Sequence, residues 1–148
     1  MSEVRIWGQG SNSSAHAVPV AINSSNTLSV NSYEAATMTS TAYAAVTAAT
    51  TNAAVVKSSG GNLFAVVVSN PTAAAINVKL YNKATTPTVG TDVPLMTIPV
   101  AAGAHVALEY GRLGMRFGSG IGIAVTAAMG ATDTTVVTAG AQVLLSYN

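Results

Sequence analysis

The segment 75–82, which reads Ala-Ile-Asn-Val-Lys-Leu-Tyr-Asn, alternates apolar and polar side chains along its length. Such alternation is typical of a half-buried β-strand, with one face on a core and the other in water. The segments 104–110 and 142–147 repeat this two-residue period, and the segment 63–68 is apolar on both faces, as a central strand is. None of them shows the 3.6-residue period of an amphipathic helix. The sequence therefore predicts strands at all four places.

Four weaker segments complete a set of eight predicted strands: 53–57, 95–100, 121–126 and 134–138. Turn-forming residues separate the strands. In Ser58–Asn62 the adjacent glycines favour a hairpin, because glycine reaches positive φ at no steric cost. Eight short strands with no helix between them predict an all-β fold, an antiparallel β-sandwich of jelly-roll-like type, over residues 51–148.

Residues 1–50 have a different character. Short extended pieces at 4–7, 15–22 and 27–30 are separated by runs rich in Gly, Ser and Asn, which are loop compositions. Residues 34–51 are rich in Ala and Thr, and their many threonines favour an extended path over a helix. We therefore expect an extended N-terminal arm, which would lie across a neighbouring subunit or fold back on its own domain.

The chain is unusually poor in charge. Only six basic and five acidic side chains occur among 148 residues, and the mean hydropathy is +0.44. A folded monomer of this mass exposes on the order of 7,000 Å², which leaves one charge per roughly 600 Å². Soluble surfaces usually carry more charge, so we expect other chains to cover part of this one. The alternative is a monomer whose Ser, Thr and Asn side chains keep it in solution.

Several partner classes are not expected. The net charge is only +1 and no basic block is present, so nothing in the sequence would follow a nucleic-acid backbone. The absence of cysteine excludes disulfides and thiolate zinc sites. The sequence shows neither the pattern of a secretory signal nor the 18 or more consecutive apolar residues typical of a membrane-spanning helix.

No constellation of catalytic residues stands out either. The two histidines, His16 in the arm and His105 on the outer face of a predicted strand, have no nucleophile beside them, and His105 is most simply a solvent or interface residue. The five acidic residues are isolated, and Asp92 and Asp133 follow glycine-containing turns, where aspartate usually accepts hydrogen bonds from the backbone. We therefore expect no enzyme activity, cofactor, metal site or small-molecule substrate.

Four residues are candidates for an interface with another chain. Trp7 is the only tryptophan and lies near Arg5 in the arm, and Trp and Arg are the types that most often anchor interfaces. Arg112 and Arg116 form a small basic spot that would suit an acidic partner. Packing of Trp7 on its own domain and ordinary solvation of the arginines are the alternatives.

A string of strand and turn residues over about two thirds of the chain resembles small structural proteins of tailed bacteriophages. It comprises Ala54–Lys57, Gly60-Gly61, Phe64–Asn70, Val78–Ala84, Pro87–Pro94, Thr97–Val100, Ala102-Gly103, Gly114–Phe117 and Ile121–Thr126, and Ala17–Ile22 of the arm is similar to segments near the start of such proteins. The resemblance implies a β-sandwich virion domain of the kind found in capsid decoration (cement) proteins, head fibres and tail-associated proteins, commonly as trimers. The group has no catalytic residues to carry over.

The resemblance and the low charge together lead to one expectation. The chain would be a decoration protein made in the host bacterial cytoplasm and carried on the outer capsid surface of the virion. It would form a homo-oligomer, with a trimer favoured, and its arm would reach across subunits of the major capsid protein. The alternative is a head-fibre or tail-associated protein whose loops 83–93 and 111–120 contact a host surface or a glycan.

Overall fold

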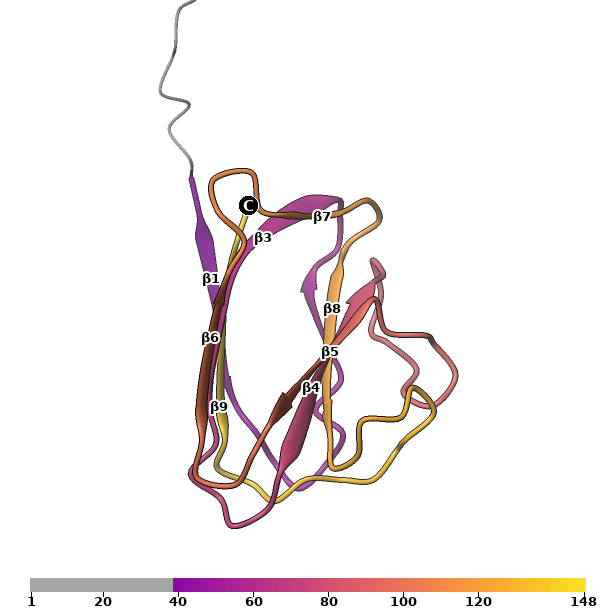
Figure 1. Cartoon of the computed structure of the whole chain (residues 1–148). Helices are drawn as coiled ribbons and strands as arrows, with labels where there is room; N and C mark the ends of the chain where they lie inside the picture. The colour runs from indigo at the N-terminus through magenta and orange to yellow at the C-terminus, as the bar shows by residue number, and fades with distance from the viewer. Residues whose placement is uncertain (1–38) are drawn as a thin grey trace, which may run out of the picture. The chain divides into compact units, whose positions relative to one another are not determined.

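The structure is a computed structural model, and it describes residues 39–148. These residues form strands and turns but no helix, so the predicted all-β class is confirmed (Figure 1). The strands are β1 (Thr41–Val46), β2 (Ala54–Lys57), β3 (Gly61–Ser69), β4 (Ile76–Asn82), β5 (Met96–Val100), β6 (His105–Glu109), β7 (Met115–Phe117), β8 (Ile121–Thr126) and β9 (Gln142–Tyr147).

The strands are antiparallel and make two sheets. One, which we call the β9 sheet, has the order β1-β9-β3-β6, and the short β7 also pairs with β3. The other, which we call the β8 sheet, has the order β2-β8-β4-β5. With β7 set aside, the chain winds between two four-stranded sheets as in a jelly roll. The predicted jelly-roll-like sandwich is therefore confirmed.

The core lies between the two sheets, which Figure 1 shows edge-on. Alternate side chains of each strand point inward, and burying a branched apolar side chain of this size contributes about 1.5–3 kcal/mol. The fully buried residues of the β9 sheet include Leu63, Val66, Val68 and Leu145, and those of the β8 sheet include Ile76, Val78, Leu80, Val100 and Ile121.

Strand β4 is buried on both faces, so the prediction of a half-buried strand is wrong for it. Its polar side chains Asn77, Lys79 and Tyr81 are 6%, 0% and 1% exposed. The loop that follows β8 covers the first two: Asn77 Nδ2 donates to the carbonyl of Ala127 at 2.9 Å, and Lys79 Nζ donates to the carbonyl of Gly130 at 2.7 Å. The alternation that the sequence shows is real, but Asn77 and Lys79 donate to backbone carbonyls instead of water.

The segment Ser58–Asn62 is not a hairpin, because β2 and β3 belong to different sheets. It carries the chain across the end of the sandwich. Its glycines are needed for space, since a Cβ at Gly60 would lie 2.6 Å from the carbonyl oxygen of Gly118, and one at Gly61 would collide with the carbonyl oxygen of Asn148. The predicted positive φ is absent from both glycines.

Two further boundaries differ from the prediction. Residues 134–138 are not a strand: they belong to the loop 127–141, where the N–H of Ala127 donates to the carbonyl of Thr135 at 3.0 Å. Strand β1 lies within the segment 1–50 assigned to the arm, and it pairs along its whole length with β9. The sandwich therefore begins at Thr41 instead of residue 51, and residues 1–38 lie outside the described part of the chain.

Candidate interaction surface

One face of the sandwich is left bare by residues 39–148. The side chains of the β9 sheet that point away from the core form a surface that we call the outer face, and the strand register arranges them in three rows. The middle row is wholly apolar, whereas the rows on either side contain polar residues. In order β1, β9, β3, β6, the rows are Ala42, Ser146, Ala65, Glu109; then Ala44, Leu144, Val67, Ala107; then Val46, Gln142, Ser69, His105.

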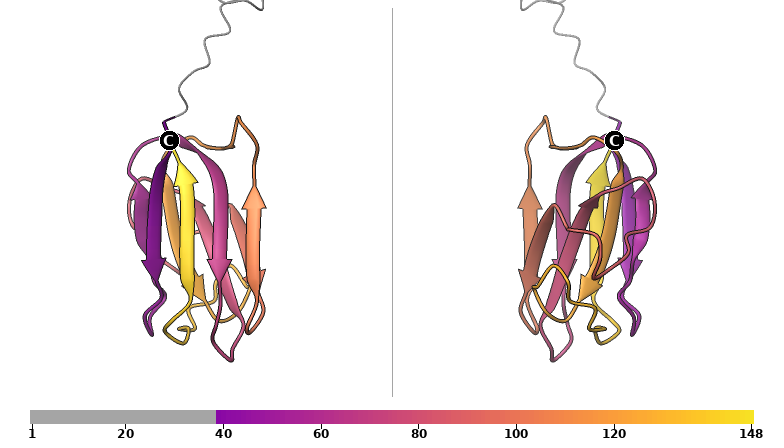
Figure 2. Two further views of the ribbon diagram at one scale, coloured as in Figure 1. Left: turned by 90° about the vertical axis from the view of Figure 1, so that its left-hand side faces the viewer. Right: turned by 90° about the vertical axis from the view of Figure 1, so that its right-hand side faces the viewer.

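Loops of the sandwich cover the outward side of the β8 sheet but leave that of the β9 sheet uncovered. In the left panel of Figure 2 the outer face is uncovered, whereas in the right panel loops cross in front of the β8 sheet. The exposed fractions of the side chains agree with this view. Leu144 and Val46 on the outer face are 42% and 65% exposed, whereas Lys79 on the β8 sheet is fully buried. The middle row of the outer face is therefore an apolar band that the described residues leave in contact with solvent.

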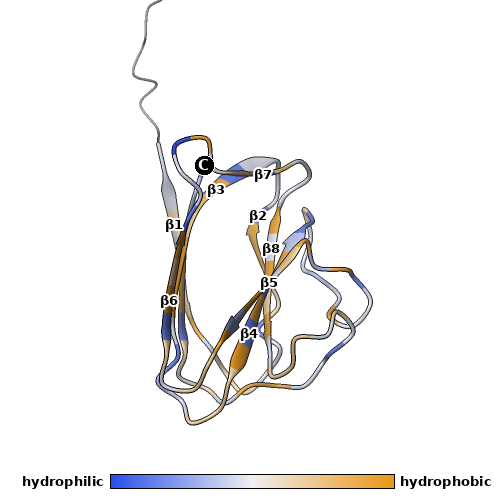
Figure 3. Ribbon diagram, in the orientation of Figure 1, coloured by the Kyte–Doolittle hydropathy of each residue, from blue (hydrophilic) through white to orange (hydrophobic). Residues whose placement is uncertain are grey.

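Two shallow hollows of about 380 Å³ each lie toward opposite ends of the outer face. The first is lined by residues that include Val46, Val67, Leu144 and His105. The second is lined by residues that include Ser40, Phe64, Glu109 and Arg112. Figure 3 shows hydrophobic stretches of the strands interrupted by hydrophilic residues. The hollows are open and mainly apolar, which suits contact with another protein surface more than an enclosed small ligand.

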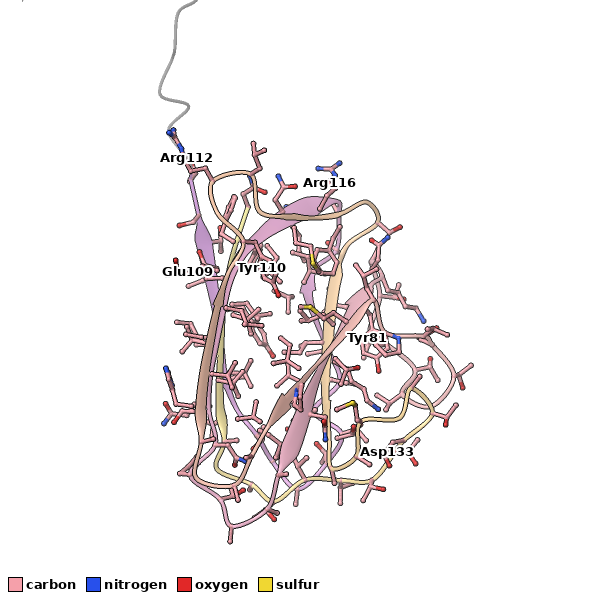
Figure 4. The ribbon with its side chains drawn as sticks, viewed as in Figure 1. Tyr81, Glu109, Tyr110, Arg112, Arg116 and Asp133 are labelled. Atoms are coloured by element: carbon pink, nitrogen blue, oxygen red, sulfur yellow. The ribbon has the colours of Figure 1, made fainter. Side chains whose placement is uncertain are left out.

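Two of the four interface candidates lie within the described residues. Arg112 lies in the loop between β6 and β7 and lines the second hollow, so it borders the outer face. Arg116 lies on β7 opposite Asn62 and is exposed at the same end of the sandwich, apart from Arg112 (Figure 4). Arg5 and Trp7 lie outside the described residues.

The loops 83–93 and 111–120, the candidates for a host-surface or glycan site, have few side chains suited to binding a sugar. Phe117, their only aromatic residue, is fully buried in the core. The loop 83–95 instead lies over its own sheet, where Lys83 forms an ion pair with Asp92 and a Cβ on Gly122 would meet Pro87 at 2.7 Å. Sugar sites generally rely on exposed aromatic faces, so these loops lack the main element of one.

The aspartates hold loops in place, as their positions in turns predict. Asp133 Oδ1 accepts hydrogen bonds from the Thr135 hydroxyl at 2.7 Å and from the Thr135 N–H at 3.2 Å, and Oδ2 accepts one from the Ala128 N–H at 2.9 Å. These bonds hold the pKa of Asp133 at about 2. Asp92 Oδ2 accepts from Lys83 and from the N–H of Thr88, which also lowers its pKa.

The remaining titratable groups of interest are a buried lysine and an exposed histidine. Burial lowers the pKa of Lys79, and the nearby Asp133 raises it in part. His105 is exposed on the outer face, as the alternation in its strand predicts. No group of three or more His, Asp or Glu side chains placed to hold a metal ion occurs within residues 39–148.

The distinguishing features of this part of the chain are thus a jelly-roll-like sandwich with one covered and one bare sheet. No helix within residues 39–148 is long and apolar enough to cross a membrane. A scan against protein-family models, a search of curated proteins and a search of solved structures each return no match.

Proposed function

We propose that the chain is a structural virion protein of a tailed bacteriophage, a capsid decoration (cement) protein that binds the major capsid shell from outside and stabilises it. It acts mechanically, without a catalytic residue, cofactor or small-molecule substrate. The observation that carries the proposal is the bare outer face, on which Leu144 and Val67 occupy the centre of an apolar band. The resemblance of the strand and turn residues to phage structural proteins supplies the identity of the partner.

The energetics suit a protein that acts in many copies. A contact of ordinary size buries about 800 Å² on each partner, of which somewhat more than half is apolar. At about 25 cal/mol per Å² of apolar area over both partners, the gross gain is roughly 20 kcal/mol, and association and side-chain ordering offset most of it. A few kcal/mol per copy, repeated over the shell, would resist the outward pressure of packaged DNA.

The number of chains in the oligomer is a separate part of the proposal. The resemblance favours three copies, whereas antiparallel pairing of one β6 strand with another would give two. The mass of the full-length chain in solution decides between them. Either number is compatible with attachment to a shell, because decoration requires only that each oligomer meet its partner at a repeating site.

The first experiment is to count this chain in purified particles by quantitative mass spectrometry, with the major capsid protein as internal reference. A copy number close to that of the major capsid protein, or a simple fraction of it, supports decoration of the shell. A dozen or a few tens of copies would place the chain in the neck, tail or head fibres, which is the alternative. Absence from the particle would refute a virion role.

The second experiment tests the outer face. Leu144→Asp places a charge in the middle of the apolar band, where Leu144 is 42% exposed and points away from the core. It should prevent binding to undecorated shells while leaving thermal unfolding within a few degrees of the wild type. Val136→Asp is the matched control, because Val136 is 53% exposed in the loop 127–141 on the other sheet. Equal binding by both variants would show that the outer face is not the contact.

A further inference from the structure

Strand β6 is a free margin of the β9 sheet. It pairs with β3 on one side, and the described residues provide no strand on the other. In the left panel of Figure 2 it forms one edge of the sheet, with β1 at the opposite edge. Unpaired N–H and C=O groups along such an edge are a template for another strand, and proteins generally cover or disrupt them.

The backbone groups that face outward can be identified from the register. The N–H of Tyr110 donates to the carbonyl of Phe64, and the carbonyl of Ala104 accepts from the N–H of Asn70. Because the hydrogen-bonded pairs of an antiparallel ladder occur at every second residue, the even-numbered residues of β6 point their N–H and C=O groups at β3. His105, Ala107 and Glu109 therefore point theirs away from the sheet.

The sequence of β6, His-Val-Ala-Leu-Glu, is self-complementary in an antiparallel pair. If two copies meet with Ala107 on the two-fold axis, Ala107 faces Ala107, and His105 of each copy faces Glu109 of the other. In this register every residue with outward backbone groups exchanges both hydrogen bonds with its opposite. An imidazole facing a carboxylate is a favourable cross-strand pair, and the symmetry makes it twice.

Apolar side chains along the same flank would be covered by this contact. Val106 and Leu108 are only half-buried, although they pack against the core. Tyr110 and Met96 are also partly buried residues packed against the core, and the Tyr110 hydroxyl contacts Met96 Sδ at 3.5 Å. In the two-fold register Val106 faces Leu108 of the second copy, so each would bury apolar surface that the single chain leaves in water.

We infer that two copies of this chain associate through β6 and form one continuous sheet, in the order β1-β9-β3-β6 and then β6-β3-β9-β1 of the second copy. The opposite edge, β1, has no charged side chain that would set a register. The pairing also joins the two outer faces into one band, with Ala107 at its centre. The inference rests on the part of the proposed function in which copies associate, but it does not require a capsid.

The experiment measures the mass of the full-length chain and of three variants by sedimentation at a series of concentrations. Ala107→Pro removes an N–H that points outward, so it deletes hydrogen bonds between copies without breaking one to β3. We expect a dimer for the wild type and a folded monomer for Ala107→Pro, with unchanged circular dichroism. A monomeric or trimeric wild type, or a dimer that Ala107→Pro leaves intact, would overturn the inference.

A charge swap tests the register. His105→Glu places two carboxylates opposite each other in both symmetric pairs and should raise the dimer dissociation constant about tenfold or more. Adding Glu109→His restores opposite partners and should return the constant to near the wild-type value. Within one chain the two residues are about 13 Å apart along the strand, so a monomer cannot produce this rescue. A double variant as weak as His105→Glu would contradict the register.

These outcomes are separate from those of the proposed function. Shell binding is measured on particles, whereas strand pairing is measured on the isolated chain. A dimer that fails to bind shells would refute decoration and keep the pairing. A chain that binds shells but is monomeric in solution at tens of micromolar would refute the pairing and keep decoration.

Discussion

Removing the hydroxyl of Tyr81 should make the protein more stable. The ring lies between β4 and the loops that cover the β8 sheet, and the residue is 1% exposed (Figure 4). Its hydroxyl has no hydrogen-bond partner among residues 39–148. Burial raises the pKa of this hydroxyl, and the negative charge of Asp92 raises it further. The hydroxyl is thus removed from water, and no group in the described part of the chain replaces the hydrogen bonds it made there.

The size of the effect follows from two opposing contributions. A buried polar group without a partner costs about 1–3 kcal/mol relative to its state in water. The Tyr81→Phe change also removes one oxygen from a packed site, and the dispersion attraction of that oxygen to its neighbours is worth up to about 1 kcal/mol. The net expectation is a gain of about 1 kcal/mol in the free energy of unfolding. For about 110 folded residues this corresponds to a melting temperature roughly 4 °C higher.

The assay is urea unfolding followed by circular dichroism, with thermal melts as a second measure. Tyr110→Phe is the matched control, because the Tyr110 hydroxyl does have a partner, the sulfur of Met96. That variant should be unchanged or slightly less stable. If Tyr81→Phe is destabilised by 1 kcal/mol or more, the hydroxyl is satisfied in solution, for example by a trapped water, and the reasoning is refuted.

Three further predictions concern the loops and the arm. Because its folded pKa is about 2, Asp133 stabilises the fold above about pH 4, and this contribution is lost as the pH falls toward 2. Thermal melts between pH 2 and 5 should show the loss as a falling melting temperature. The Asp133→Asn variant should show a weaker dependence of melting temperature on pH. Gly90→Ala should lower the free energy of unfolding in urea by about 2–3 kcal/mol, because φ is +90° and the new Cβ would lie 2.7 Å from Thr134 Cγ2. Gly103→Ala is the matched control: its φ is +66° but nothing lies within 4 Å of the new Cβ, so the loss should be only about 1–2 kcal/mol. Deleting residues 2–38 should abolish shell binding without unfolding the strands, and a truncated chain that still binds and decorates shells would contradict a role for the arm.

Sequence alone predicts the strands in which the alternation of apolar and polar residues matches the burial of the two faces. β6 and β9 alternate because one face meets the core and the other is bare. β1 shows little alternation, since it lies at the margin of the sheet and most of its small side chains are exposed. β7 is too short at three residues to show a period at all. The Thr- and Val-rich residues 134–138 have strand propensity but no strand beside them.

The candidate surface was only partly predictable for a related reason. The outward direction of His105 follows from the two-residue period of its own strand. The sequence does not predict which of the two sheets remains bare, because this depends on where the loops 83–95 and 127–141 pack. Lys79 illustrates the limit: a lysine on the polar face of a strand suggests solvent, and only the fold reveals the carbonyls of Gly130 and Asp133 around it.

The position of β9 also has a consequence for how the chain acquires its structure during synthesis. Of the strands in residues 39–148, β9 is the last to leave the ribosome, yet it lies between β1 and β3 in the middle of its sheet. Until it emerges, β1 has no neighbour, and β3 exposes an edge rich in valine. Such long-range closure is slow and leaves the nascent chain open to association with others. A ribosome stalled before Gln142 would therefore hold a chain inclined to aggregate, whereas release of β9 would close the sheet in one step.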